Sequence, residues 1–271
     1  MNGDIVVVRG GGDIASGVIQ KLHRVGFRLL VLESEHPTSV RRTVSFSEAV
    51  YDGSMELEGM TAVLVKNTVE IYHAWAMDYV PVAADPNGEY IGKFKPVAVV
   101  DAIIAKRNTG MHRGLAPVTI AMGPGFTAKK DVDVVIESNR GHNLGRLIFE
   151  GEAEPNTGMP GNIAGYTRER VLNAPGDGTI ATVRKIGEVV KAGDVIAYVN
   201  GTEIPSKIDG IVRGLIRDGT YVTNGLKVGD IDPRIEQLEN CYTISDKARA
   251  IGGAVLEALL IELKKISIYE V

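Results

Sequence analysis

The stretch that decides the fold is IVVVRGGGDIASGVIQKLHRVGFRLLVLE, residues 5–33. It opens with a continuous apolar run, 5–8, which is typical of a buried parallel strand. A glycine-rich turn follows, and apolar residues then recur at helical spacing until Gly26, which is placed to end a helix. The run RLLVLE, 28–33, has the composition of a second strand. Together these segments predict a βαβ unit.

More strand-like runs continue this pattern: 61–65, 97–100, 118–122 and 132–136. Asn67 and Glu70 have the spacing of a capping box ahead of a helix that carries Trp75. Ser45 and Glu48 have the same spacing before another short helix. Strands that alternate with helical segments predict an α/β fold, a Rossmann-like, doubly wound parallel sheet.

A different architecture begins near Leu172, after a loop at 139–170 that is rich in Gly, Asn and Pro. Matching residues recur at an offset of 32: Asp177-Gly178 and Asp209-Gly210, Ile180 and Val212, Gly187 and Gly219, Val190 and Val222, Gly193 and Gly225, Ile196 and Val228. Several matches at one offset indicate two copies of a β unit. Neither copy could cover its apolar face alone, so we expect the two to form a small all-β sandwich or barrel.

The C-terminal segment has a helical pattern. Ser245 is a candidate N-cap for an apolar stripe that continues to Leu263. Gly252-Gly253 would weaken this helix unless another segment packs closely there. We expect the helix to return to the α/β domain or to contact another subunit. The expected domains are a Rossmann-like domain, a barrel-sandwich domain and a helical segment: 1–170, 171–232 and 233–271.

Composition restricts the function classes. The 271-residue chain has 44% apolar residues and a net charge of −4, so it can form a core but has no broad basic surface for nucleic acid. Its one cysteine, Cys241, excludes an intramolecular disulfide and fits a packing role. The sequence shows no signal peptide and no apolar stretch that could span a membrane, and a cytoplasmic protein is expected.

The first candidate site is the glycine-rich turn. Gly10-x-Gly12-x-x-Ala15, with Glu33 at the end of the second strand, matches a dinucleotide-binding fingerprint. Gly10 would allow a tight turn, Gly12 would let the backbone approach a pyrophosphate, and Ala15 would allow close helix packing. Glu33 could accept hydrogen bonds from a ribose. The alternative is an ordinary turn that binds nothing, with Asp13 as a helix cap.

Other candidates follow the ends of later strands, where ligands bind in open parallel sheets. These segments include Asp101, the sequence GPGF at 123–126 and the sequence ESNRGHN at 137–143. The last one combines an acid, amides, a guanidinium and an imidazole, although a solvated loop with a local ion pair is the alternative. Arg41 and Arg42 could clamp a phosphate or form a solvated pair.

Metal and nucleophile sites are not indicated. The histidines are scattered without ligand spacing, so we expect no metal site: His23, His36, His73, His112 and His142. No serine lies in a nucleophile elbow.

Long segments resemble the YqeB-type accessory proteins of the selenium-dependent molybdenum hydroxylase system, relatives of the XdhC/CoxI maturation proteins. The similarity covers nearly the whole chain and is carried by seven segments: GGGDIASG (10–17), RRTVSFSEAVYDG (41–53), AKRNTGMHRGLAPVTIAMGPGFTA (105–128), VIESNRGHNLGRLI (135–148), EPNTGMPG (154–161), VGDIDPR (228–234) and ISDKARAIGGAVLEA (244–258). The resemblance implies that the chain handles a pyranopterin nucleotide molybdenum cofactor, or a selenium-modified form, for a hydroxylase client.

The resemblance also indicates which positions are functional: Gly123, Gly125, Phe126, Glu137, Arg140, Gly141 and His142. Arg140 is suited to phosphate or oxo-anion contacts, whereas Glu137 and His142 are the candidates for catalysis. Gly141 would let the chain turn so that its two neighbours face a shared ligand.

The 32-residue repeat resembles the two halves of a biotinyl or lipoyl domain, which carries a modified lysine on a hairpin between the halves. Here Asn200-Gly201 fits a type I′ turn, and Lys207 follows the hairpin instead of occupying its tip. This departure favours a structural or docking module.

Three functions therefore stay open. The first is a cofactor-binding maturation factor, the second an NAD-dependent oxidoreductase supported by the fingerprint and Glu33, and the third a non-enzymatic docking or carrier protein. Whether the chain is an enzyme is left open. The expected partners are a nucleotide-type small molecule and a hydroxylase client, without nucleic acid or membrane, and the chain could form a homo-oligomer.

Because the hairpin has no lysine at its tip, the purified protein should carry no lipoyl or biotinyl group. Intact-mass spectrometry should give the unmodified polypeptide of 29.1 kDa. A stoichiometric lipoyl or biotin adduct would contradict this prediction.

Overall fold

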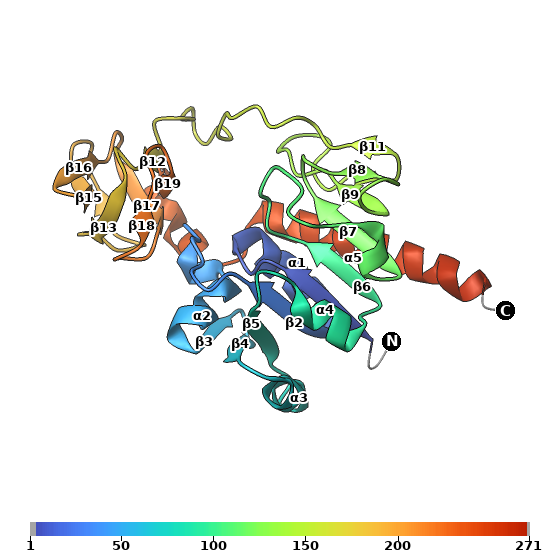
Figure 1. The fold of residues 1–271 in the computed structure, drawn as a ribbon. Helices are drawn as coiled ribbons and strands as arrows, with labels where there is room; N and C mark the ends of the chain where they lie inside the picture. Colours follow the sequence, from blue (N-terminus) through green and yellow to red (C-terminus); the bar gives the residue numbers. More distant parts are fainter. Residues whose placement is uncertain (1–3, 270–271) are drawn as a thin grey trace. The chain divides into compact units, whose positions relative to one another are not determined.

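The computed structural model describes residues 4–269. A nine-stranded sheet forms the core of the larger of its two units (Figure 1). Its strand order is β10-β9-β7-β6-β1-β2-β5-β4-β3. The strands are β1 (Ile5–Arg9), β2 (Arg28–Glu33), β3 (Ser54–Leu57), β4 (Met60–Val65), β5 (Val80–Ala84), β6 (Ala98–Asp101), β7 (Val118–Met122), β9 (Val134–Ile136) and β10 (Leu147–Ile148). All neighbouring pairs from β9 to β4 are parallel, and only the edge strands β10 and β3 are antiparallel. The expectation of a large, mostly parallel sheet is therefore confirmed.

The predicted βαβ unit is present. Helix α1 (Asp13–Arg24) joins β1 to β2, and Gly26 has the positive φ of 93° that allows the chain to leave the helix. The capping box also forms, because the Asn67 side chain accepts a hydrogen bond from the backbone N–H of Glu70 at 3.0 Å before helix α3 (Thr68–Ala76). The expected cap at Ser45 is wrong: its side chain does not cap the 3₁₀ turn η2 (Phe46–Glu48), which leads into α2 (Ala49–Asp52).

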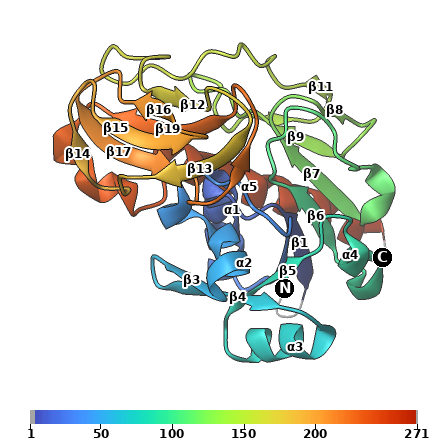
Figure 2. The same ribbon diagram turned by 60° about the vertical axis from the view of Figure 1, so that its left-hand side comes forward.

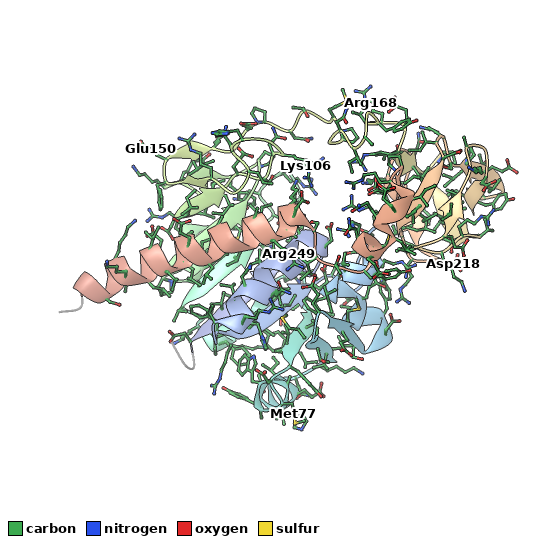
Figure 3. All side chains as sticks on the ribbon, turned by 180° about the vertical axis from the view of Figure 1, so that it is seen from behind. Met77, Lys106, Glu150, Arg168, Asp218 and Arg249 are labelled. Carbon is green, nitrogen blue, oxygen red and sulfur yellow. The ribbon has the colours of Figure 1, made fainter. Side chains whose placement is uncertain are left out.

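Helices cover the sheet on both faces. On one face, apolar residues from alternate strand positions pack with α3 and α4 (Glu89–Phe94) in one buried cluster, which includes Val7, Ile71 and Ile91. On the other face lie α1 and the long C-terminal helix α5 (Asp246–Tyr269), which contact each other (Figure 3). The central strands β1 and β7 are buried on both sides, as their continuous apolar runs predict.

Helices α1 and α5 approach at backbone distance. A Cβ atom added to Gly17 would lie 2.2 Å from the carbonyl oxygen of Ala248, and one added to Gly252 would lie 2.3 Å from the carbonyl oxygen of Gly17. Only glycine fits at either position without moving the helices apart. This contact is the close packing that the Gly252-Gly253 pair requires.

The smaller unit contains two four-stranded sheets, β12-β19-β17-β14 and β16-β15-β13-β18 (Figure 2). The strands are β12 (Val171–Asn173), β13 (Gly178–Thr182), β14 (Val189–Val190), β15 (Val195–Val199), β16 (Thr202–Pro205), β17 (Gly210–Leu215), β18 (Tyr221–Val222) and β19 (Lys227–Asp232). Each sheet takes strands from both copies of the repeat, because β14 pairs with β17 and β18 pairs with β13. The two halves are therefore interlocked.

Equivalent hydrogen bonds link the two halves of this unit. The Asp177 carboxylate accepts a hydrogen bond from the backbone N–H of Asn224 at 2.7 Å. The Asp209 carboxylate accepts the matching one from Ala192 at 2.8 Å. The apolar repeat positions meet in a shared core: Ile180, Val190, Ile196, Val212, Val222 and Val228. Each aspartate thus fixes a turn in the opposite copy, which explains why the repeat spacing is visible in the sequence.

The two compact units of the structure have other boundaries than the expected domains 1–170, 171–232 and 233–271. The larger unit comprises 1–37, 45–156 and 244–271, so α5 belongs with the large sheet. The smaller unit comprises 38–44 and 157–243 and includes the 3₁₀ segments η1 (Arg42–Val44) and η4 (Ile235–Cys241). Two additional short strands, β8 (Thr127–Ala128) and β11 (Gly151–Glu152), pair within the larger unit, where η3 (Arg113–Leu115) precedes β7.

Two neighbouring glycines of α5 provide a matched test of its packing. Gly252→Ala should destabilise the fold by roughly 1–3 kcal/mol, because its Cβ would meet backbone. Gly253→Ala should be neutral or stabilise by about 0.5–1 kcal/mol, since no atom lies within 4 Å of its added Cβ. Chemical denaturation of both variants measures the difference. Equal stabilities would contradict the close contact between α1 and α5.

Candidate functional site

The parallel strands deliver four polar loops to one edge of the large sheet. Because β9, β7, β6 and β1 are neighbours and parallel, their carboxyl ends meet there. The loops that leave this edge begin at Gly10, Ala102, Gly123 and Glu137. The structure therefore brings together the glycine-rich turn, the segment 123–126 and the segment 137–143 as the sequence predicts.

The glycine-rich turn is held by its neighbours. Gly10 has a φ of 91°, and a Cβ there would lie 3.1 Å from the backbone of Ile103. The N–H of Gly11 donates to the Glu33 carboxylate at 2.8 Å, and the carbonyl of Gly11 accepts from the N–H of Ser47 at 2.9 Å. Both polar groups of the central glycine are thus engaged within the protein.

Glu33 has a structural role in this conformation. Its second carboxylate oxygen accepts a hydrogen bond from the N–H of Ser34 at 2.7 Å, in addition to the bond from Gly11. This differs from the predicted ribose contact, because both carboxylate oxygens already accept backbone hydrogen bonds. Gly12 is the extended N-cap residue of α1, and Ala15 is fully buried as expected for close packing.

The predicted phosphate clamp is also engaged elsewhere. Arg41 is buried, and its guanidinium donates to the carbonyl of Asn240 at 2.8 Å. The Arg42 Nε donates to the carbonyl of Leu215 at 2.8 Å. Both arginines lie in the smaller unit, where they hold the 38–44 segment in place. Within that unit the hydrogen bonds give both arginines a structural role, which differs from the predicted phosphate clamp and from a solvated pair.

A buried ion pair anchors the sheet edge. Arg9, at the end of β1, donates to the Asp101 carboxylate at the end of β6 at 3.0 Å, and both side chains are almost fully buried. Burial raises the pKa of Asp101, and the charge of Arg9 opposes this shift. Arg9 also donates to the carbonyl of Thr109 at 2.7 Å, so the pair fixes the loop after β6.

The glycines after β7 serve loop packing. Gly123 has a φ of 79°, and its Cβ would lie 2.5 Å from the Ser138 hydroxyl. Gly125 has a φ of 104°, and its Cβ would lie 2.6 Å from the backbone of Arg107. These contacts join the loops after β6, β7 and β9. Phe126 is 1% exposed and belongs to the apolar core, so its ring offers no surface to a ligand, contrary to the prediction.

Glu137 organises its own loop. It is 2% exposed, and its carboxylate accepts hydrogen bonds from the N–H groups of Asn139 at 2.6 Å and Glu154 at 2.7 Å. These bonds give Glu137 a positioning role in its loop, and its catalytic role stays a prediction. Asn139 and Asn143 in turn donate hydrogen bonds to the Glu154 carboxylate. Both bonds lower the pKa of Glu154, and the bond from Asn139 has the larger effect.

The exposed end of this loop carries the remaining candidates. Arg140 forms a two-point ion pair with Asp246 of α5, at 2.7 and 3.1 Å. Gly141 has a φ of 147°, which supplies the predicted turn. His142 is exposed and has no hydrogen bond within the described residues, so its imidazole is accessible to a ligand.

Sequence reasoning did not single out two basic residues at this edge, Arg9 and Lys247. Arg9 directly precedes the glycine-rich turn, but its buried partner is far away in the sequence. Lys247 lies in the first turn of α5, behind Ser245, whose hydroxyl accepts a hydrogen bond from the N–H of Ala248. Its position beside the loops depends on how α5 packs, and the sequence pattern of the helix does not reveal it.

Among residues 4–269, no group of three or more His, Cys, Asp or Glu side chains is arranged to hold a metal ion. No helix in the same part of the chain is both long and apolar enough to cross a bilayer.

The chain is a close homologue of the uncharacterized protein YqeB from Escherichia coli (strain K12). The two are 51% identical over 256 residues, which cover 94% of this chain and 47% of that protein. The chain therefore spans about half the length of this curated relative. No protein-family model matches the chain.

Solved structures give only distant similarities. A succinylglutamate desuccinylase/aspartoacylase from Rhodobacter sphaeroides is 15% identical with a TM-score of 0.27, covering 85% of both chains. The ectoine utilization protein EutE (DoeB) from Ruegeria pomeroyi, with product bound, is 10% identical with a TM-score of 0.25, covering 84% of this chain and 85% of that one. TM-scores this low do not indicate a common function.

The buried ion pair at the sheet edge can be tested by removing one charge. Asp101→Asn should destabilise the protein by about 3–5 kcal/mol, because it leaves the Arg9 guanidinium buried without a countercharge. Chemical denaturation measures the loss. Replacing both partners, with Arg9→Met and Asp101→Leu, should recover much of it. A double variant no more stable than Asp101→Asn would contradict this account of the pair.

Proposed function

We propose that this chain is an accessory protein for molybdenum hydroxylases, including selenium-dependent ones, and that it binds a pyranopterin nucleotide form of the molybdenum cofactor. It would assist the modification of that cofactor or its insertion into a client enzyme. One observation carries the proposal. The segments 10–17, 105–128 and 135–148, which resemble the maturation family, contribute loops to the same edge of the Rossmann-like sheet.

The chemistry of this edge suits the organic part of such a cofactor. Backbone N–H groups at Gly12 and basic side chains such as Arg140 are donors for a phosphate. The described residues present no cluster of metal ligands, so the pterin itself would carry the molybdenum and supply its redox chemistry. His142, being exposed, is placed to give or take a proton at the imidazole nitrogen.

An NAD-dependent oxidoreductase is the second candidate, favoured by the glycine fingerprint between β1 and α1. The hydrogen bonds at this turn weigh against it. Glu33, the residue that would bind the ribose, accepts bonds from Gly11 and Ser34, and Ser47 donates to the carbonyl of Gly11. A ribose hydroxyl bound at Glu33 would have to share its carboxylate with these backbone donors.

We propose that the smaller, biotinyl/lipoyl-like unit is a docking module. Its hairpin between β15 and β16 turns at Asn200 and Gly201, with φ values of 49° and 82°, as a type I′ turn requires. Lys207 lies beyond β16 and not on this tip. A module without an attachment lysine fits recognition of a client better than transport of a covalently attached group.

Three substitutions at the sheet edge test the proposed function. Gly12→Val should abolish binding of the nucleotide-type ligand by steric exclusion. Arg140→Ala should weaken binding with little loss of folding stability, because its ion pair with Asp246 is exposed. His142→Ala should impair hydroxylase activation more than ligand binding. Activation is measured in a strain whose hydroxylase activity depends on this protein.

A matched control is available. Arg113→Ala also removes an exposed arginine from an ion pair, with Asp133 directly before β9. This pair lies at the amino ends of β7 and β9, the opposite edge of the sheet from the candidate site, so activation should be unchanged. Full activation by the double variant Arg140→Ala, His142→Ala at normal expression would contradict the proposed function.

A further inference from the structure

Helix α3 presents an apolar surface to solvent at the rim of the larger unit (Figures 1 and 2). Val69 is 75% exposed and Tyr72 is 58% exposed, and Ala76 continues the same stripe at the spacing i, i+3, i+7. The opposite side of the helix is buried, since Ile71 and Ala74 belong to the apolar core. A surface helix normally carries polar residues on its outer side, so α3 has the composition of a helix that is covered on both sides.

Aromatic rings extend this surface onto the neighbouring helix α4. The ring centroids of Tyr72 and Trp75 are 5.4 Å apart, and the ring of Phe94 lies 5.9 and 5.5 Å from them. These are the distances of packed aromatic pairs, so each ring restrains the others. A restrained surface loses little side-chain entropy when a partner covers it. We call this surface the α3 patch: Val69, Tyr72, Trp75, Ala76 and Phe94.

The outer side of α3 is complementary to itself. Its four exposed positions, Val69, Tyr72, His73 and Ala76, are spaced symmetrically about the point between Tyr72 and His73. If two copies of α3 pack antiparallel about a two-fold axis at that point, Val69 of one copy faces Ala76 of the other, and Tyr72 faces His73. A larger apolar side chain thus meets a small one, as a self-complementary contact between two copies requires.

The charges at the two ends of α3 are complementary as well. Lys66, before the helix, is exposed, and its ammonium group has no ion pair within the described residues. Asp78, after the helix, has a carboxylate that is 94% exposed and lies 3.4 Å from the imidazole of His23. In an antiparallel pair, Lys66 of each copy lies beside Asp78 of the other. A parallel pair would bring like charges together at both ends.

We propose that the chain forms a homodimer through the α3 patch, with the two α3 helices antiparallel about a two-fold axis. Burial of Val69 and Tyr72 against the second copy stabilises the dimer. Two ion pairs between Lys66 and Asp78 fix the direction of the helices. One short helix and its flanking rings form a small interface, below about 1,200 Å², so the affinity is expected to be micromolar. The dimer does not depend on the proposed function.

Sedimentation velocity of the full chain between about 1 and about 500 μM measures this association. The monomer of 29.1 kDa should give way to a species of twice that mass as the concentration rises. Val69→Glu should weaken dimerisation by at least about tenfold, because it buries a carboxylate at two symmetric positions. The monomer should keep its stability, because Val69 is exposed and glutamate suits the first turn of a helix. Leu260→Glu, at an exposed apolar residue of α5, is the matched control and should dimerise like the unmodified chain.

Charge reversal tests the antiparallel arrangement. Lys66→Glu alone puts two acids together at each end of the pair, and Asp78→Lys alone puts two ammonium groups there. Each variant should therefore dimerise at least about threefold more weakly than the unmodified chain. An equimolar mixture of the two variants restores opposite charges at both ends and should form heterodimers more readily than either variant forms homodimers. Both side chains are exposed, so both variants should fold, which circular dichroism checks.

Three results would overturn the proposed dimer. The first is a chain that stays monomeric over the whole concentration range. The second is a dimer that Val69→Glu leaves intact, because its contact would lie elsewhere on the surface. The third is a mixture of the two charge variants that associates no better than either variant alone, because the helices would then not be antiparallel.

Discussion

The backbone contact between α1 and α5 is the constraint on which the candidate site depends. Gly17 lies against Ala248 and Gly252, and a Cβ on Gly252 would also meet Lys21. The contacting residue numbers increase together, so the two helices run in the same direction and begin at the same edge of the sheet. Lys247 reaches that edge only because glycine lets α5 approach α1 so closely.

A polar network fixes the same helix start. Glu58 accepts hydrogen bonds from Gln20 of α1, from Arg249 of α5 and from the N–H of Ile244. Burial opposes ionisation of Glu58, but these bonds and the charge of Arg249 hold its pKa below the usual value. Acid is therefore expected to loosen this network, because a lowered pKa makes its stabilisation disappear as pH falls through that pKa.

The parts of the fold that could be predicted are those with a regular pattern of residues in the sequence. The βαβ unit follows from apolar periodicity and glycine placement, and the repeat follows because each copy fixes a turn in the other through Asp177 or Asp209. The sequence pattern does not reveal strand β5, because its short run contains Pro81, and proline is unusual inside a sheet. Helices, strands and the repeat could thus be predicted where many residues recur at one regular spacing.

The candidate site was only partly predictable. Topology brought the segments 123–126 and 137–143 to one edge, as parallel strands require. The sequence did not show that Glu33 and Glu137 accept backbone hydrogen bonds, nor that Phe126 is buried. These features, like the position of Lys247, arise from contacts between segments far apart in the chain, and composition carries no signal for them.

We propose that this sheet edge holds a pyranopterin nucleotide. Mass spectrometry of the small molecules that co-purify with the protein from its native host tests that claim most directly. A bound pterin dinucleotide, lost when Gly12 is replaced with Val, is the predicted result. Bound NAD, or a protein isolated without any nucleotide-type ligand, would contradict it.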